Sequence, residues 1–254
     1  MQNKKQYTVD KLTVKISDTR AEMGALAARE IHETLLALLE KKEWVNMIFA
    51  AAPSQNEVLE ALLSYKDIPF ERIRAFHMDE YIGLPATAPQ RFGNFLYEHI
   101  FGRAPFGEVY YIDSSAEAEA ECARYTALLQ KYPTDIVVMG IGENGHIAFN
   151  DPGVADFADP LTIKLAKLDE VCRMQQVHDG CFATIDEVPT HAFTLTCPTL
   201  MRATYKFCIV PAKTKAAAVA RTLSGEVSDE CPATLLRTVE NAVLYLDGDS
   251  SSLL

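Results

Sequence analysis

Apolar residues follow two patterns that alternate along most of the chain. Over residues 18–41 they recur every three or four positions, which predicts an amphipathic helix that Asp18 can cap. The run VNMIFAAA, residues 45–52, is short and continuously apolar, which is typical of a buried strand. Further strands are predicted over 73–82, 109–113, 135–142, 191–197, 205–211 and 242–247, and further helices over 56–65, 89–101, 116–132 and 213–225.

This alternation indicates the fold class. Helices and strands follow one another nearly throughout, and several strands lack a polar face, which favours a doubly wound, mostly parallel α/β sheet of Rossmann-like type, flanked by helices. No repeat or linker divides the chain, so residues 1–254 are expected to form a single domain. Because ligands of such sheets bind beyond the carboxyl ends of the strands, segments 51–56, 77–82, 140–151 and 211–215 should share one rim.

Composition narrows the range of partners. The formal net charge of −11 argues against a nucleic-acid surface, although a local basic cluster could still hold a small anion. No apolar run approaches the ~20 residues that span a bilayer, and the polar N-terminal segment lacks the features of a secretory signal. We therefore expect a cytoplasmic protein. The six cysteines form no CxxC pair and show no metal-ligand spacing, so reduced thiols and no bound metal are expected.

The segment MGIGENGHIAFNDPG, residues 139–153, contains the spacing Gly140-x-Gly142-x-x-Gly145. In a dinucleotide-binding turn this spacing leads directly into a long helix, whose N-terminus faces the pyrophosphate. Here only four residues separate Gly145 from Asn-Asp-Pro-Gly, which is a strong turn signal. The glycines are therefore expected to shape a tight loop that brings His146 close to a ligand.

Acid and base side chains stand on the same predicted rim. The segment FHMDEYIGL, residues 76–84, ends a predicted strand with Asp79 and Glu80, and only one of these should line a site because neighbouring strand residues point to opposite faces. An imidazole from His146 with carboxylates from Asp79 and Asp151 suits proton transfer on a sugar. Taken singly, Asp79 could be a solvated loop acid and His146 a buried core histidine.

Five segments together carry a more specific signal. They are FHMDEYIGL, MGIGENGHIAFNDPG, VPTHAFTLTCPTLMRA, PAKTKAAAV and SDECPATLL, and they are spread over most of the chain. In these segments the chain resembles glucosamine-6-phosphate deaminases, also called isomerases, which share a fold with 6-phosphogluconolactonases. The lactonase branch shares GHIA but is expected to lack the Asn-acid-Pro that follows, so FNDPG together with MDEYIGL favours the aminosugar branch.

The resemblance implies a reaction and roles for particular residues. The family opens the ring of an aminosugar phosphate, moves a proton from C2 to C1 and releases ammonia, with no metal or redox cofactor. By position, Asp79 would be the base at C2, His146 would act in ring opening, and Asp151 would orient the imidazole. Asn144 stands where the family often has an acid, and its amide can still orient His146.

The phosphate-binding part departs most from the family. A loop that is usually Gly-Gly/Ser-Thr-Pro is here AAAPSQNE, residues 50–57. Ser54 is expected to supply a hydroxyl, and Lys215 matches the family's phosphate lysine, with Lys213 nearby. A family arginine aligns with His178, and Arg91 is a speculative compensating charge. The substrate contacts predicted in this way are Ser54, Glu80, Gly145, Arg173, His178 and Lys215.

Three functions stay open at this point. The resemblance favours isomerisation and deamination of a hexosamine 6-phosphate, with glucosamine or galactosamine 6-phosphate as the phosphosugar. The alternatives are a sugar-phosphate lactonase, which needs no base at C2, and a non-catalytic sugar-phosphate-binding protein, which needs no proton shuttle. The sequence leaves the hexosamine epimer and the oligomeric state undecided, a homo-oligomer included.

Overall fold

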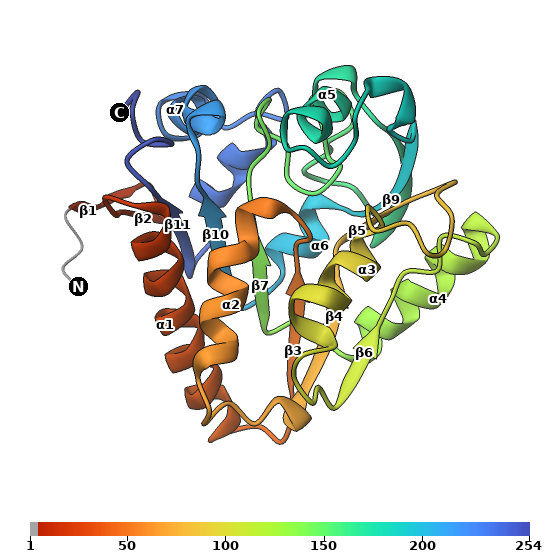
Figure 1. The fold of residues 1–254 in the computed structure, drawn as a ribbon. Helices are drawn as coiled ribbons and strands as arrows, with labels where there is room; N and C mark the ends of the chain where they lie inside the picture. The colour runs from red at the N-terminus through yellow and green to blue at the C-terminus, as the bar shows by residue number, and fades with distance from the viewer. Residues whose placement is uncertain (1–4) are drawn as a thin grey trace.

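The main sheet has eight strands, in the order β1-β2-β11-β10-β7-β3-β4-β6, in a computed structural model that describes residues 5–254 (Figure 1). Every neighbouring pair of strands is parallel except β1 and β2, and this confirms the predicted doubly wound, mostly parallel α/β fold. The strands are β1 (Lys5–Val9), β2 (Leu12–Ile16), β3 (Val45–Phe49), β4 (Ile73–His77), β6 (Glu108–Tyr110), β7 (Ile136–Met139), β10 (Tyr205–Val210) and β11 (Ala242–Leu246).

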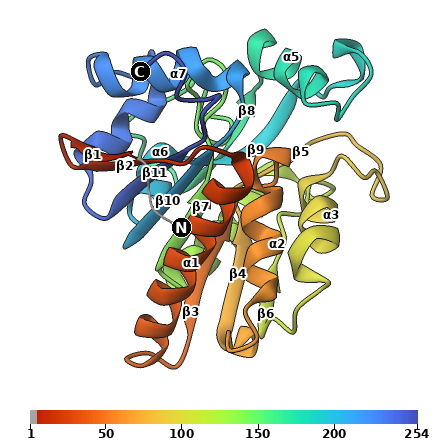
Figure 2. The same ribbon diagram turned by 60° about the vertical axis from the view of Figure 1, so that its left-hand side comes forward.

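Helices cover both faces of this sheet. One face carries α1, α2 and α3, while α4, α6 and α7 pack on the other. Figure 2 shows α1, α2 and α3 side by side on their face. The helices are α1 (Arg20–Leu39), α2 (Asn56–Ser64), α3 (Phe92–Leu96) with a π-helical continuation (Tyr97–Phe101), α4 (Ala118–Lys131), α5 (Glu170–His178), α6 (Cys197–Met201) and α7 (Ala216–Ser224). Short 3-10 turns lie at Pro53–Gln55, Phe70–Arg72, Ile185–Glu187, Lys213–Lys215 and Pro232–Thr238.

Burial on both faces explains why the central strands are continuously apolar. In β3, Met47 and Phe49 belong to the core beneath α1 and α2, whereas Ile48 belongs to the core on the opposite face. In β7, Val138 and Val137 divide in the same way. A strand with helices on both sides has no solvent-facing positions, so the alternation that marks a half-exposed strand is absent.

A small antiparallel sheet lies beyond the carboxyl ends of the main strands. Its order is β5-β9-β8, with β5 (Asp79–Tyr81), β9 (His191–Leu195) and β8 (Ile163–Lys167). The strand predicted over 73–82 is therefore two strands, because the chain leaves the main sheet at Met78. The strand predicted over 191–197 exists, but it pairs in this small sheet rather than in the parallel one.

Some boundaries differ from the predictions. Thr19, not Asp18, caps α1: its hydroxyl accepts the Glu22 amide at 3.2 Å, and the Glu22 carboxylate accepts the Thr19 amide at 3.3 Å. The hairpin of β1 and β2, strand β8 and helix α5 were not predicted. In α5 the reason is clear, since its buried residues include Gln175 and Gln176, which break the apolar stripe expected of a helix.

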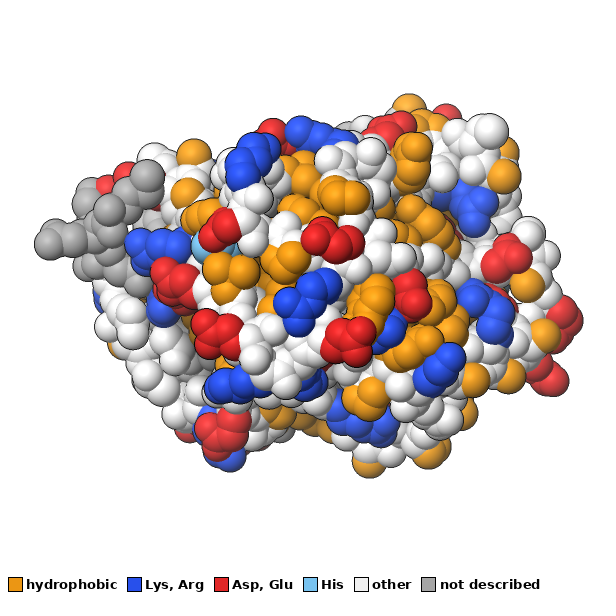
Figure 3. All heavy atoms as spheres, turned by 90° about the horizontal axis from the view of Figure 1, so that it is seen from below, with side chains coloured by type: hydrophobic (Ala, Val, Ile, Leu, Met, Phe, Trp, Pro, Cys, Tyr) orange, Lys and Arg blue, Asp and Glu red, His pale blue; other side chains and the backbone are white. Residues whose placement is uncertain are grey.

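Within residues 5–254, no helix combines the length and the apolar character that a bilayer span requires. On the face at the amino ends of the parallel strands, lysine and arginine side chains are interspersed with aspartate and glutamate (Figure 3). The basic side chains on this face do not gather into one continuous area.

The point where the chain leaves the main sheet is held by a buried hydrogen-bonded cluster. His77, fully buried at the end of β4, donates from Nδ1 to the carbonyl of Asp79 at 2.8 Å and accepts the Ile112 amide at Nε2 at 2.8 Å. The Tyr125 hydroxyl accepts the His77 amide at 3.1 Å and donates to the His77 carbonyl at 2.8 Å. Burial lowers the pKa of His77 to about 4, so the ring is neutral and can make both contacts.

Replacing Tyr125 by Phe tests this cluster. Tyr125→Phe leaves a buried amide and carbonyl of His77 without these partners, so the free energy of unfolding should fall by about 1–3 kcal/mol. Urea denaturation measures the change, with Tyr97→Phe as the matched control because the Tyr97 side chain is 60% exposed. Equal stability of the two variants would contradict the role given to the Tyr125 hydroxyl.

Candidate functional site

A pocket opens at the carboxyl ends of the four central parallel strands. Its walls come from residues 50–55 after β3, 78–79 after β4, 140–149 after β7 and 211–215 after β10. The predicted common rim is thus confirmed. The pocket lies where the strand order reverses: β4 and β6 follow β3 on one side, whereas β10 and β11 follow β7 on the other. Ligands of doubly wound sheets bind at such a switch point.

The glycine-rich loop is built around an imidazole. A side chain at Gly142 would place its Cβ 2.1 Å from Cε1 of His146, so the ring packs against bare backbone. Gly145 has φ +92°, and a Cβ there would lie 2.6 Å from the sulfur of Cys231. The next α-helix after β7 in the described chain is α5, so the dinucleotide turn is excluded. Gly145 shapes the loop and is not among the residues that line the pocket.

His146 is held in one tautomer. Its Nδ1 lies 2.7 Å from Oδ1 of Asn144 and 3.0 Å from Oδ1 of Asp151. The Asn144 oxygen also accepts the His146 amide at 3.0 Å, and the Asn144 amide group donates to Asp151 at 3.0 Å, which fixes the orientation of the asparagine. Because both neighbours of Nδ1 are acceptors, Nδ1 carries a proton, and Nε2, which lies 4.0 Å from Sγ of Cys172, is the nitrogen that can gain or lose one.

Asp151 is fully buried yet stays ionised. Burial alone would raise its pKa, but the hydrogen bonds that Asp151 accepts from His146 and Asn144, together with the positive charge of the imidazole when it is protonated, outweigh burial and lower the pKa below its usual value. An anionic Asp151 next to Nδ1 stabilises the imidazolium that forms when Nε2 accepts a proton.

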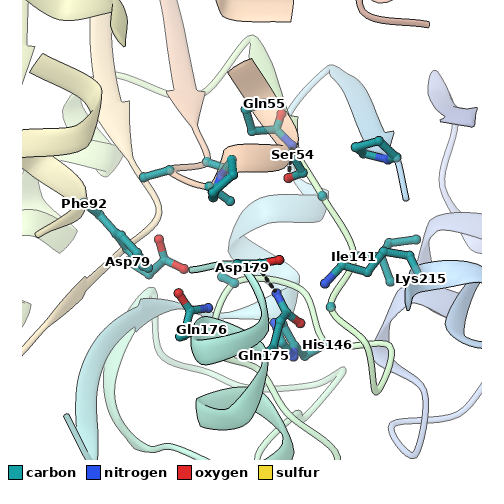
Figure 4. Close-up of a pocket in the computed structure, with 18 of the residues that line it drawn as sticks. Ser54, Gln55, Asp79, Phe92, Ile141, His146, Gln175, Gln176, Asp179 and Lys215 are labelled. Atoms are coloured by element: carbon teal, nitrogen blue, oxygen red, sulfur yellow. Dashed lines mark hydrogen bonds between the residues drawn. The ribbon is translucent and has the colours of Figure 1, made fainter. Parts of the chain in front are cut away.

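Asp79 approaches the same pocket from another wall. The carboxyl of Asp79 and the ring of His146 both line the cavity (Figure 4). Burial raises the pKa of Asp79 well above its ordinary value, and the neighbouring Glu80 carboxylate raises it further. A buried carboxylate that has lost much of its hydration is a stronger base than an exposed one.

Glu80 faces away from the pocket, so only one of the two adjacent acids lines it, as predicted. The Glu80 carboxylate accepts amides of Tyr81 at 3.0 Å, Phe92 at 3.0 Å and Gly93 at 2.9 Å, and so it caps α3. The substrate contact predicted for Glu80 is therefore wrong. Arg91 lies 3.8 Å from Glu80 on that side and does not line the pocket, so it does not supply a compensating charge there.

Two cations mark one end of the pocket. Lys215 is 5% exposed, and its Nζ has no hydrogen-bond partner among the described residues. Burial lowers the pKa of Lys215. Arg20, the first residue of α1, contacts the Pro53 carbonyl and pairs with Glu57 at 2.7 Å, so it braces the loop that carries Ser54. Ser54 lines the pocket, as predicted.

Two predicted phosphate contacts lie elsewhere. Arg173 donates to the carbonyls of Ile185 at 2.6 Å and Val188 at 2.9 Å, and so it ties α5 to the following turn. The His178 side chain is 51% exposed, with Nδ1 3.2 Å from the Glu143 carboxylate. Neither Arg173 nor His178 lines the pocket. Both predictions are corrected because Arg173 is bound to the turn after α5 and His178 lies beside Glu143, so neither side chain is placed to contact a phosphate in the pocket.

The face of α5 that does line the pocket carries Gln175, Gln176 and Asp179. Gln175 accepts the Glu143 amide at 2.8 Å, which joins α5 to the glycine-rich loop. These residues carried no motif, so sequence reasoning missed them. Arg20 was also missed, although a cation on the first turn of a helix is electrostatically unfavourable and is a usable signal of another role.

Comparison with known proteins agrees with this geometry. Residues 18–245 match the family model described as glucosamine-6-phosphate isomerases/6-phosphogluconolactonase. A glucosamine-6-phosphate deaminase of Listeria monocytogenes serotype 4a (strain HCC23) is 35% identical over 211 residues, which cover 83% of this chain and 88% of that protein. A glucosamine-6-phosphate deaminase of Bacillus cereus (strain B4264) is 33% identical over 243 residues, covering 95% and 88%.

Solved structures give the same picture. A monomeric glucosamine-6-phosphate deaminase superimposes with a TM-score of 0.86 at 27% identity, covering 95% of this chain and 99% of that one. The 6-phosphogluconolactonase of Thermotoga maritima superimposes with a TM-score of 0.76 at 22% identity, covering 93% and 100%, which shows a shared fold. The chain belongs to the family of glucosamine-6-phosphate isomerases and 6-phosphogluconolactonases.

Proposed function

We propose that this enzyme converts a hexosamine 6-phosphate to a ketose 6-phosphate and ammonia, with glucosamine 6-phosphate or its galacto epimer as substrate. The observation that carries the proposal is one pocket that presents a buried carboxyl, Asp79, an imidazole with a free Nε2, His146, and an unpartnered buried ammonium, Lys215. A base, a proton carrier and an anion-binding group are what this reaction needs on one phosphosugar.

Ring opening is assigned to His146. Its Nε2 takes the proton of the anomeric hydroxyl and returns it to the ring oxygen as the C1–O5 bond breaks, which leaves an open-chain aldehyde. Asn144 and Asp151 hold the proton on Nδ1 throughout, so the ring gains and loses charge only at Nε2. No other group is required for this step.

Proton transfer between carbons is assigned to Asp79. The carboxylate removes the C2 proton, the electron pair forms the C1–C2 double bond with the negative charge on O1, and the same proton returns to C1 while one proton of the amino group passes to O1. This leaves an imine at C2, and water adds to that carbon with release of ammonia. A carboxylate is a weak base toward carbon, so the raised pKa of Asp79 and a fixed position close to C2 both support the assignment.

The phosphate is assigned to the end of the pocket at Lys215 and Ser54. Within the turn Pro53–Gln55 before α2, the Ser54 amide can add a donor, because Pro53 has no N–H and the amides of Gln55 and Asn56 donate to the carbonyls of Ala52 and Pro53. Asp179 also lines the pocket, and its negative charge acts on Lys215. The net positive charge available to the phosphate is therefore smaller than the charges of Lys215 and Arg20 alone would give.

A deaminase is preferred to a lactonase for two reasons. The curated relatives that are a third identical over most of the chain are deaminases, whereas likeness to the Thermotoga lactonase extends to the fold. Lactone hydrolysis also has no use for a base at C2. The cytoplasmic location and the independence from cofactors stay predictions, while the hexosamine epimer and the oligomeric state are left undecided by the sequence.

Replacing Asp79 by Asn tests the function directly. Asp79→Asn removes the base but keeps the shape, so ammonia release from glucosamine and galactosamine 6-phosphates should fall by roughly 10²–10⁴-fold with little change in KM. Coupled assays of ammonia and ketose phosphate measure both products, and 6-phosphogluconolactone serves as a control substrate. Undiminished ammonia release by the variant, or hydrolysis of the lactone alone by the unmodified enzyme, would overturn the proposal.

Two lysines two residues apart provide a matched test of the phosphate site. Lys215→Met should raise KM for the phosphorylated substrate by roughly 10–100-fold, since a hydrogen bond to a charged group contributes about 1.5–3 kcal/mol. Lys213→Met should leave KM unchanged because Lys213 is exposed and does not line the pocket. The same rise in both variants would indicate a diffuse charge effect and would contradict the assignment of Lys215.

The pH dependence of kcat/KM tests the base. Asp79 must be ionised to act, and its pKa is raised, so activity should fall on the acid side at a higher pH than for an ordinary carboxylate. Glu80→Gln removes the neighbouring negative charge, which lowers the pKa of Asp79 and moves this acid limb to lower pH. An acid limb that stays in place or moves to higher pH in Glu80→Gln would contradict the role of Asp79.

A further inference from the structure

A hydrogen-bonded bridge lies at the end of the pocket to which the phosphate is assigned. Gln55 is fully buried and lines the pocket, and its Nε2 donates to the Ser54 hydroxyl at 3.0 Å (Figure 4). The same Nε2 donates to the carbonyl of Ile209, in β10, at 3.3 Å. The bridge therefore joins the loop after β3 to the strand that leads to Lys215.

The direction of both hydrogen bonds in this bridge is fixed. A backbone carbonyl can only accept, so the Ile209 carbonyl requires the NH2 group of the Gln55 amide, rather than its oxygen, on that side. The NH2 group has two protons, and the second is directed at Ser54. The Ser54 oxygen is therefore the acceptor in its hydrogen bond with Gln55.

Gly140 leaves the space that this bridge occupies. A Cβ at this position would lie 3.2 Å from Nε2 of Gln55, 3.3 Å from the Ile209 oxygen and 3.5 Å from Oγ of Ser54. The first two distances are shorter than the usual separation of packed atoms, so a side chain here would press on both ends of one hydrogen bond. The first glycine after β7 thus makes room for the bridge, whereas Gly142 makes room for the imidazole.

We infer that Gln55 is a positioning residue that makes the Ser54 hydroxyl a hydrogen-bond donor to the phosphate. With its oxygen engaged by Gln55, the hydroxyl directs its own proton to another acceptor, and the accepted bond polarises the hydroxyl and strengthens the bond that it donates. Nζ of Lys215 is also a donor only, which suits a fully ionised phosphate. The inference rests on the proposed function in one respect, which is that a phosphate binds at Ser54.

Calorimetry with an unreactive ligand tests the inference. The ligand is 2-amino-2-deoxyglucitol 6-phosphate, and the control ligand is the same compound without the phosphate, measured by competition. Ser54→Ala should weaken binding of the phosphorylated ligand by roughly 10–100-fold and Gln55→Met by roughly 3–10-fold, since a hydrogen bond to a charged group contributes more than the neutral bond that supports it. Adding Gln55→Met to Ser54→Ala should have no further effect, because Gln55 acts through that hydroxyl. Binding of the control ligand should be the same in all four proteins.

A loss on Gln55→Met that persists in the Ser54→Ala background would overturn the inference. So would unchanged binding of the phosphorylated ligand by Gln55→Met, an equal loss for both ligands, or equal affinity of the unmodified enzyme for the two ligands. Gln55→Leu, which also lacks a polar side-chain atom, repeats the comparison if the methionine variant folds poorly. If the expected losses occur in an enzyme that releases no ammonia, the inference holds and only the proposed function fails.

Discussion

The pairing of Nδ1 of His146 with Asn144 and Asp151 is the interaction on which the site depends. It fixes the tautomer, keeps a buried carboxylate ionised, and leaves Nε2 as the one reactive nitrogen. The loop geometry follows from it, since the ring fits only where Gly142 has no side chain. Ala148 and Ala212, which line the same pocket, have φ of +52° and +82°, so two of the four non-glycine residues with positive φ in residues 5–254 lie at this pocket.

A second constraint places the acid opposite the imidazole. The main sheet would carry Asp79 and Glu80 straight on, but the chain turns at Met78 into the small sheet. The hydrogen-bonded cluster of His77 and Tyr125 stabilises that turn, and the Glu80 carboxylate accepts hydrogen bonds from the start of α3. The two neighbouring acids thus have different roles. Glu80 caps α3, and its negative charge raises the pKa of Asp79, which stays buried at the pocket as the base.

Features of the fold that determine burial could be predicted from the sequence, whereas the directions of individual side chains could not. The rim segments and the α/β architecture followed from apolar runs, which report burial directly. Strand alternation predicted that only one of Asp79 and Glu80 lines the site, and the family resemblance indicated Asp79. The position of α5 did not, because a helix that presents Gln175 and Gln176 to a pocket lacks an apolar stripe. Alignment with a family arginine placed His178 near the phosphate, and Arg173, five residues earlier, was added as a substrate contact, yet a position on a helix does not tell which way its side chain points.

The account stands on one hexose lying between Asp79 and His146 with its phosphate at Lys215. A crystal structure with the open-chain 2-amino-2-deoxyhexitol 6-phosphate, which cannot react, tests this directly. We expect C2 about 3–3.5 Å from an Asp79 oxygen, the distance of a reactive arrangement, and the phosphate on Lys215 and Ser54. A ligand bound with its phosphate at Lys215 but with C2 turned away from Asp79, or bound outside this pocket, would contradict the account.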